Sequence, residues 1–155
     1  MIRRAIREDI PHLAELFRQL HAHHAAIKPE TFRMPDGEWF AERIRGIFED
    51  GETVILVSAD CEPNGYAVIK IIDVNTEDKY PRRMCYIDCF AVAENARRHG
   101  IGTALFGEVK RFARENGCTS VQLGVAACNT GAMEFYRRMG LVPRTLQLEV
   151  RIGDS

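Results

Sequence analysis

The chain has 155 residues, 46% hydrophobic and 28% charged, which fits one domain whose core buries roughly 70% of the unfolded surface. Its 21 Lys and Arg residues balance 22 Asp and Glu residues, which excludes a generally basic surface for nucleic acid or anionic membranes. No apolar run approaches the length of a membrane span, and the N-terminus lacks a signal-peptide core. We therefore expect a single cytoplasmic domain over residues 1–155, with no nucleic-acid or membrane partner.

The first half of the chain predicts one strand, two helices and a hairpin, in that order. Glu8 and Asp9 favour a helix start, and Asp36 can cap a second helix. The turn sequence Glu62-Pro63-Asn64-Gly65 separates two β-branched runs, which predicts an antiparallel hairpin. The apolar stripe of the first helix comprises Ile10, Leu13, Phe17 and Leu20. The predicted strands are residues 2–6, 53–58 and 66–74, and a loop covers residues 27–35.

The second half predicts a strand, a helix, a strand, a helix and a final strand. A crossover from the strand at 84–92 through a helix to the strand at 121–125 should place these two strands parallel and adjacent. The last helix spans about 129–139, and Leu146, Leu148 and Val150 then alternate with polar residues as a closing strand. This order predicts an α/β (α+β) fold built on a mixed sheet, and ligands collect at the carboxyl ends of such strands.

The five cysteines are odd in number and show no C-x-x-C spacing, which argues against a disulfide framework and a zinc site. Cys85 and Cys89 lie four residues apart on a predicted strand, so they should share a face as small buried hydrophobes rather than as a reactive pair. His21, His23 and His24 end a predicted helix without a carboxylate at ligand spacing. A solvated helix end near a substrate loop is favoured over a metal site, so we expect no metal.

Two motifs carry most of the chemical information. Residues 97–103, Arg-Arg-His-Gly-Ile-Gly-Thr, follow a strand and open a helix, where glycines let backbone N–H groups converge on a phosphate. Gly-x-Gly also occurs in dinucleotide folds and plain turns, but the third glycine and the ribose-binding acidic residue are missing here. In the second motif Asn129 starts a helix and Tyr136 follows two turns later. Together they suggest a coenzyme with a pyrophosphate and a reactive end that needs a proton donor.

These features resemble the GNAT superfamily of acyl-CoA-dependent N-acetyltransferases over nearly the whole chain. The resemblance rests on the order of elements and on two patterns: Arg97, Gly100 and Gly102, then Asn129, Ala132, Tyr136, Gly140 and Leu141. It implies a mostly antiparallel sheet of about six to seven strands flanked by four helices. It also implies an enzyme that moves the acetyl group of acetyl-CoA, its co-substrate, to a primary amine.

The resemblance implies a coenzyme site along the end of one strand and the start of two helices. Backbone amides of residues 97–103 would meet the pyrophosphate, and the backbone of residues 90–92 would pair with the pantetheine arm. The bulky basic residues of the loop have a solvated turn as their alternative, and Asn129 could simply cap its helix. The implied coenzyme-binding residues are Phe90, Ala91, Val92, Arg97, Arg98, His99, Gly100, Ile101, Gly102, Thr103, Asn129 and Tyr136.

In the same resemblance the amine attacks the thioester directly, through a tetrahedral intermediate stabilised by backbone N–H near Val92. Tyr136 would be the general acid to the departing thiolate, and packing is its alternative role. Asp88 is the candidate base, through a water, because a carboxylate in an apolar strand has to be satisfied. Its alternative is an exposed carboxylate or one paired with a nearby Arg. Glu52 and Glu134 are weaker candidates for the base.

The acceptor is not identified by the sequence. In the family the first two helices, their connection and the last strands shape the acceptor site, which here indicates His24, Phe32, Trp39 and the loop 27–35. Helix packing is the favoured role of Trp39. The acceptor is a small-molecule amine or a peptide or protein amine, and a homodimer is left open. Two other hypotheses remain: a non-catalytic acyl-CoA-binding or sensor module, and a nucleotide-binding domain.

Overall fold

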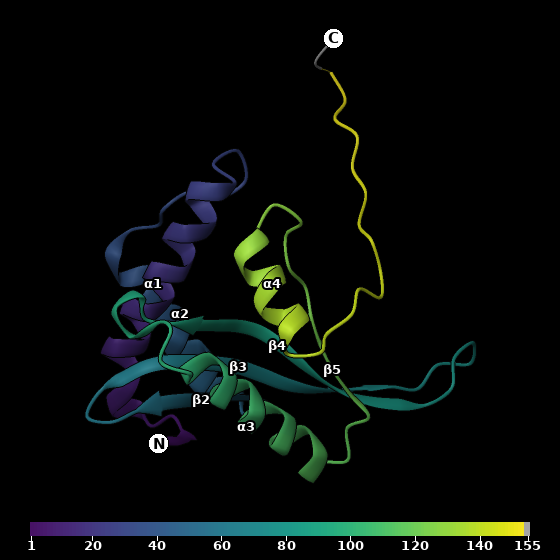
Figure 1. The fold of residues 1–155 in the computed structure, drawn as a ribbon, viewed down its shortest axis with the longest axis horizontal. Helices are drawn as coiled ribbons and strands as arrows, with labels where there is room; N and C mark the ends of the chain where they lie inside the picture. The colour runs from purple at the N-terminus through teal and green to yellow at the C-terminus, as the bar shows by residue number, and fades with distance from the viewer. Residues whose placement is uncertain (154–155) are drawn as a thin grey trace. The chain divides into compact units, whose positions relative to one another are not determined.

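The structure, a computed structural model, describes residues 1–153 and divides the chain into two compact units, residues 1–124 and the residues from 125 onward. In the first unit, five strands form one sheet in the order β1-β2-β3-β4-β5 (Figure 1). Pairing is antiparallel from β1 to β4 and parallel between β4 and β5. The strands are β1 (Ile2–Arg4), β2 (Thr53–Ala59), β3 (Pro63–Val74), β4 (Arg82–Val92) and β5 (Ser120–Leu123). The predicted hairpin and parallel crossover are both confirmed.

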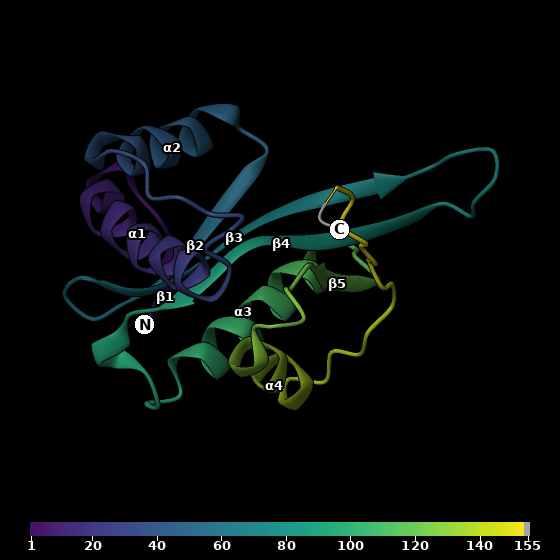
Figure 2. The ribbon, with the colours of Figure 1, turned by 90° about the horizontal axis from the view of Figure 1, so that it is seen from above.

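Helices of the first unit cover both faces of its sheet (Figure 2). On one face lie α1 (Ile10–Ile27) and α2 (Gly37–Asp50), whose Leu13 and Ile44 share a buried cluster with Val57 of β2. On the other lies α3 (Ile101–Glu115), whose Leu105 and Val109 are fully buried. These residues belong to the apolar stripes of their helices, which therefore decide which side of each helix meets the sheet. No helix among residues 1–153 is long and apolar enough to cross a bilayer.

A β-bulge interrupts β4 at Asp88. Ile87 pairs with Ile69 and Cys89 pairs with Val68, so Asp88 is an extra residue between two neighbouring pairs. The extra residue reverses the alternation of β4, and Cys85 and Cys89 consequently lie on opposite faces of the sheet. The prediction that they share a face is wrong. An even spacing places two residues on one face only in a regular strand, and the extra residue of the bulge lies between these two.

Both cysteines are nevertheless packing residues, as expected. Cys85 is fully buried, and Cys89 packs against the cluster under α1 and α2. Burial raises the pKa of each thiol to about 11, with smaller contributions from Cys118 at Cys85 and from Asp88 at Cys89. Neither thiol is therefore an activated nucleophile near neutral pH.

An ion pair between half-exposed Arg3 and buried Asp9 lies at the start of α1. The carboxylate of Asp9 accepts two hydrogen bonds from the Arg3 guanidinium, at 2.7 and 3.0 Å, and one from the Ile6 amide at 2.8 Å. Asp9 is only 5% exposed. The Arg3 hydrogen bonds hold the pKa of Asp9 below its usual range, although burial opposes them. Arg3 belongs to β1, so this pair ties the edge of the sheet to the helix that covers it.

Replacing Asp9 with Asn should lower the free energy of unfolding by about 2 kcal/mol at pH 7, because Arg3 loses its charged partner. The folded-state pKa of Asp9 is depressed, so its contribution is present above pH 3.8 and is lost as pH falls through the folded-state value. Urea denaturation at pH 7 and at about pH 3 should show the difference from the parent protein shrinking in acid. The exposed neighbour change Glu8→Gln is the control, and an equal cost at both pH values would contradict the ion-pair account.

At the start of α2 the outcome differs from the prediction. Asp36 occupies the N-cap position, but its side chain makes no capping hydrogen bond to the helix. The C-terminal end is as expected, because Gly51 ends α2 in the left-handed conformation at φ 72°. Asp36 instead lines a surface cavity at the connection between α1 and α2.

The second unit contains one helix, α4 (Thr130–Arg138), as predicted. The closing strand predicted around Leu146, Leu148 and Val150 is wrong: within residues 1–153 the structure forms no strand there, and the three side chains are 77%, 86% and 81% exposed. Alternation shows which face a strand would bury, but a strand forms only where a neighbour accepts its backbone hydrogen bonds. The described sheet therefore has five strands rather than about six to seven.

Candidate active site

Strands β4 and β5 are paired over only part of their length. The parallel register runs from Met84 beside Ser120 to Ile87 beside Leu123, whereas β4 continues to Val92. Over this last stretch β3 remains the partner of β4, with Val92 opposite Gly65. The carboxyl end of β4 thus extends past β5, at the edge where ligands of such sheets bind. Residues 90–92, expected to meet the pantetheine arm, lie in this extension.

The glycine loop follows β4 after one turn of 3₁₀-helix, Glu94–Ala96, and opens α3 as predicted. Gly100 is the N-cap residue in the left-handed conformation at φ 77°, and Arg98 also has a positive φ of 67°. The loop is tied to the strand before it, because Arg97 Nε donates to the Val92 carbonyl at 3.2 Å. The ring of His99 contacts the Ala96 carbonyl through Nδ1 at 3.2 Å. The loop is therefore an ordered connection from β4 to the helix.

The helix end that this loop presents is suited to an anion. The first amides of a helix have no acceptor within the helix, and here they belong to Ile101, Gly102 and Thr103. The helix dipole adds positive potential at the same place, and the exposed Arg98 guanidinium adds a full charge. This donor set fits the pyrophosphate of a coenzyme in charge and in hydrogen-bond direction.

The β4 bulge determines where Asp88 lies. Its carboxylate forms an ion pair with Lys70 of β3, with Oδ2 3.4 Å from Nζ, so its partner is a lysine rather than an arginine. The two side chains are 36% and 40% exposed. Asp88 also lines a cavity of about 210 Å³ between the sheet and helices α1 and α2. The weaker candidate Glu52 lies exposed after α2, and its amide donates to Asp50.

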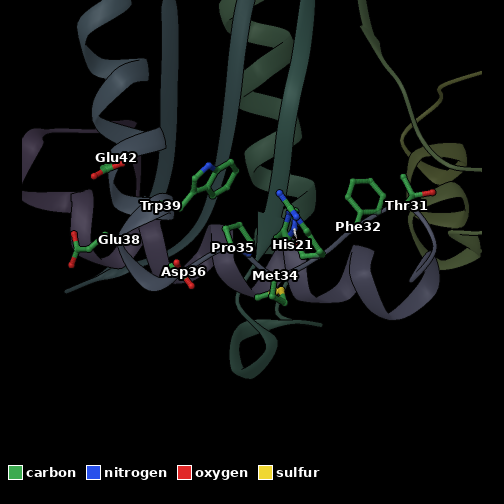
Figure 3. A pocket seen from close by; sticks show the side chains of 10 residues that line it. His21, Thr31, Phe32, Met34, Pro35, Asp36, Glu38, Trp39 and Glu42 are labelled. Carbon is green, nitrogen blue, oxygen red and sulfur yellow. Dashed lines mark hydrogen bonds between the residues drawn. The ribbon is translucent and has the colours of Figure 1, made fainter.

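A larger cavity of about 800 Å³ lies at the connection between α1 and α2 (Figure 3). His21 orders one wall, because its Nε2 lies 2.6 Å from the Arg33 carbonyl oxygen. Phe32 and Trp39 both line the cavity, as expected of acceptor-site residues. Trp39 also stacks on Phe17, with ring centroids 5.8 Å apart, so it packs and lines the cavity at once.

The third residue expected here, His24, does not line this cavity. Its ring packs against that of Phe32, with centroids 5.4 Å apart, so His24 contacts a residue of the cavity wall without lining the cavity itself. Burial, and then the neighbouring His23 and His21, lower the pKa of His24, so it is neutral at pH 7. Among residues 1–153 no group of three or more side chains is arranged to hold a metal ion.

Sequence reasoning did not single out the carboxylates of the large cavity. Asp36, Glu38 and Glu42 all line it, and Figure 3 labels all three. Glu38 and Glu42 are four residues apart in α2, a spacing that places two side chains on one helix face. That spacing was the available signal, although it does not tell which helix face borders a cavity. Together with the aromatic rings, the carboxylates make a wall suited to a cationic amine.

The second motif lies in the second unit. Asn129 is the N-cap of α4, and its Oδ1 accepts a hydrogen bond from the Ala132 amide at 3.3 Å, so the capping role is confirmed. Tyr136 is half-buried in α4, and its ring meets that of Phe135 edge-on at 5.3 Å. Glu134 pairs with Arg137 at 2.7 Å, and this bond lowers the pKa of Glu134. A shared ligand for Tyr136 and the glycine loop stays a prediction.

Two comparisons of sequence agree with these features. The model of the acetyltransferase (GNAT) family matches residues 13–141. An uncharacterized N-acetyltransferase of Methanocaldococcus jannaschii is 28% identical over 139 residues, which cover 90% of this chain and 59% of that protein. A streptothricin acetyltransferase of Streptomyces lavendulae is 34% identical over 105 residues, covering 68% and 50%. The chain spans about half the length of these relatives.

Solved structures show the same fold. A mutant of the BH1408 protein of Bacillus halodurans superposes with a TM-score of 0.92 at 23% identity, covering 98% of this chain and 99% of that chain. An aminoglycoside N-acetyltransferase in complex with CoA gives a TM-score of 0.76 at 16% identity, covering 97% and 93%. At these identities the likeness concerns the fold alone.

Proposed function

The chain belongs to the acetyltransferase (GNAT) family, and on that premise we propose that it moves the acetyl group of acetyl-CoA to a primary amine. One observation carries the proposal. The carboxyl end of β4 extends beyond its pairing with β5, and the glycine loop after it forms the amino end of α3. An extended arm can pair with the strand edge while the helix end binds its phosphates. A dinucleotide does not need the extended strand edge, which is why a coenzyme with a pantetheine arm is favoured.

In the proposed complex, different residues of the first unit bind different parts of the coenzyme. The amides of residues 101–103, with Arg97, Arg98, His99 and the Thr103 hydroxyl around them, bind the pyrophosphate. Backbone groups of residues 90–92 hold the arm, and an amide near Val92 stabilises the negative oxygen that develops on the thioester carbonyl. Positioning of the two reactants contributes a large part of the rate.

Two side chains handle protons in the proposed reaction. Asp88 takes a proton from the acceptor ammonium through a water, which leaves the amine free to attack the thioester carbonyl. Tyr136 donates a proton or a hydrogen bond to the departing thiolate, and Asn129 contacts the coenzyme in addition to capping α4. These assignments follow the family resemblance.

We propose the α1–α2 cavity as the acceptor site. Its Trp39 and Phe32 rings and its carboxylates favour a positively charged amine, and His24 supports its wall. The names of two similar proteins, one a streptothricin acetyltransferase and one an aminoglycoside N-acetyltransferase, point to polycationic amines as the first acceptors to try. A peptide or protein amine is the other class to be tested.

Release of free thiol from acetyl-CoA, measured against a panel of amines, tests the proposed function directly. The panel contains streptothricin, aminoglycosides, polyamines, amino acids and a peptide N-terminus. Thiol release with at least one amine, together with the acetylated product, is the expected result. Binding of coenzyme A without thiol release for any amine would instead favour a non-catalytic acyl-CoA-binding module.

Replacing Gly100 with Ala should weaken the binding of coenzyme A about tenfold, measured by titration calorimetry. The reason is conformational: a Cβ at Gly100 meets nothing within 4 Å, but φ of 77° is strained for alanine by about 1–2 kcal/mol, so the loop shifts. Gly51→Ala is a matched control, with φ of 72° and the same open space at the end of α2. Equal affinities in the two variants would contradict a role of the loop in binding.

A further inference from the structure

A completely buried tyrosine, Tyr66, is among the residues that line the small cavity under α1 and α2. Tyr66 of β3 is completely buried, and its hydroxyl has no hydrogen-bond partner among residues 1–153. Burial raises the pKa of Tyr66 well above its usual range, so the group stays a neutral hydroxyl that can both donate and accept. Buried hydroxyls are almost always hydrogen-bonded, to protein or to water. The partner of Tyr66 is therefore to be sought in the cavity that it lines.

The cavity has the size and the polarity to hold water. Its volume is about 210 Å³, and a water molecule needs only on the order of 30 Å³ together with two or more polar partners. Buried Tyr66 lies at one end, whereas Asp88 and Lys70 are more than a third exposed, so the cavity leads from the core to solvent. The apolar Phe17 is the contribution of α1. The charged and titratable groups around it are Arg43 and Asp50 from α2, Tyr66 and Lys70 from β3, and Asp88 and Cys89 from β4.

The bulge explains why Asp88 is among them. In a regular strand Asp88 and Cys89 would point to opposite faces, but the extra residue lets both line the cavity on the side of α1 and α2. The same pairing places Cys89 opposite Val68, which lies between Tyr66 and Lys70 along β3. The carboxylate of the candidate base and the unpartnered hydroxyl thus share one polar cavity.

We propose that this cavity holds the water through which the proton of the acceptor ammonium leaves, and that Tyr66 positions that water against Asp88. The inference rests on the proposed function. The ammonium donates one proton to the water, and the water passes a proton to the Asp88 carboxylate, which releases it to solvent at its exposed side. The neutral amine forms the new C–N bond, and the C–S bond breaks as Tyr136 donates a proton to the thiolate. The second nitrogen proton leaves through the same water, and Tyr136 regains a proton from solvent, so the products are the amide, the thiol and one free proton. Tyr66 touches neither reactant and is a positioning residue.

Tyr66→Phe tests the role of the hydroxyl, because it removes one oxygen and keeps the buried ring. For an acceptor with an amine pKa of about 10, kcat should fall about fivefold, with KM for acetyl-CoA unchanged. For an arylamine or hydrazide acceptor with a pKa below about 6, which arrives unprotonated, the change should be less than about twofold. Tyr80→Phe, at a tyrosine 93% exposed in the β3–β4 loop, is the matched control. An equal loss for both acceptors would overturn the proposal, since that is the effect of a merely structural residue.

Two further measurements separate this inference from the proposed function. Asp88→Asn should show the same dependence on amine pKa, and adding Tyr66→Phe to it should lower kcat no further; additive losses would overturn the shared path. A crystal structure should place an ordered water within hydrogen-bond distance of the Tyr66 hydroxyl and the Asp88 carboxylate, and a dry cavity would overturn the proposal. If the parent protein acetylates no amine, the proposed function fails and the inference fails with it. If activity persists while the two acceptors lose rate equally, only the inference fails.

Discussion

Replacing Tyr136 with Phe should lower kcat of the acetyl transfer about a hundredfold and leave the affinity for acetyl-CoA close to that of the parent protein. The phenol is the proposed proton donor to the departing thiolate, and general acids contribute on the order of 10² to 10⁴ in rate. The change removes only the hydroxyl, so the half-buried ring of α4 keeps its edge-on contact with Phe135. Thiol release at saturating amine gives kcat, and calorimetry gives the affinity.

The control for this experiment is again Tyr80→Phe, which removes the same group from an exposed loop residue. It should leave both kcat and affinity unchanged. An unaltered rate in Tyr136→Phe on an amine that the parent protein acetylates would remove Tyr136 from the mechanism. A loss of coenzyme affinity equal to the loss of rate would assign it to binding instead.

Replacing Leu13 with Ala should lower the free energy of unfolding by about 3 kcal/mol, the largest stability effect expected here. Leu13 is 0% exposed in the first turn of α1, where it packs in the cluster with Ile44, Val57 and Val68. Truncation removes buried methyl groups and leaves a cavity that rigid neighbours on the sheet cannot fill. Urea denaturation monitored by the single tryptophan, Trp39, measures the change.

Leu148→Ala is the matched control for Leu13→Ala, since the same atoms are removed from a side chain that is 86% exposed. Its expected effect is within about 0.5 kcal/mol. A cost above about 1.5 kcal/mol would show that Leu148 is buried in solution, and dependence of that cost on protein concentration would point to a homodimer. The pair of variants therefore also tests whether the side chain of Leu148 is exposed in solution.

Local patterns in the sequence were sufficient for most elements of the fold. The stripe of α1 predicted that helix and two of the residues that it buries, Ile10 and Leu13, because a helix repeats every 3.6 residues whatever it packs against. Gly100 and Gly51 predicted a helix start and a helix end, since both positions need a positive φ. The parallel crossover followed from a single helix between two strands. The same kind of pattern misled at Leu148, where alternation was present and a pairing strand was not.

The candidate site was predictable only in its local parts. The glycine loop and Asn129 stand out because a single motif determines their backbone role. The carboxylates beside Trp39 did not, since the cavity depends on how the α1–α2 connection folds back on α2. The sequence also did not predict the buried, unpartnered hydroxyl of Tyr66, because a tyrosine in a strand is ordinarily a packing residue.

The sequence by itself determined the succession of helices and strands as far as α4, the glycine at the start of α3 and the capped start of α4, each of which depends on residues within a few positions of one another. Only the tertiary structure decided where the register between β3 and β4 shifts. The bulge at Asp88 arises from pairing with Val68 and Ile69, about twenty residues away, and no local pattern reports it. That one extra residue places Cys85 and Cys89 on opposite faces of the sheet and puts Asp88 beside Lys70, in the cavity that Tyr66 also lines.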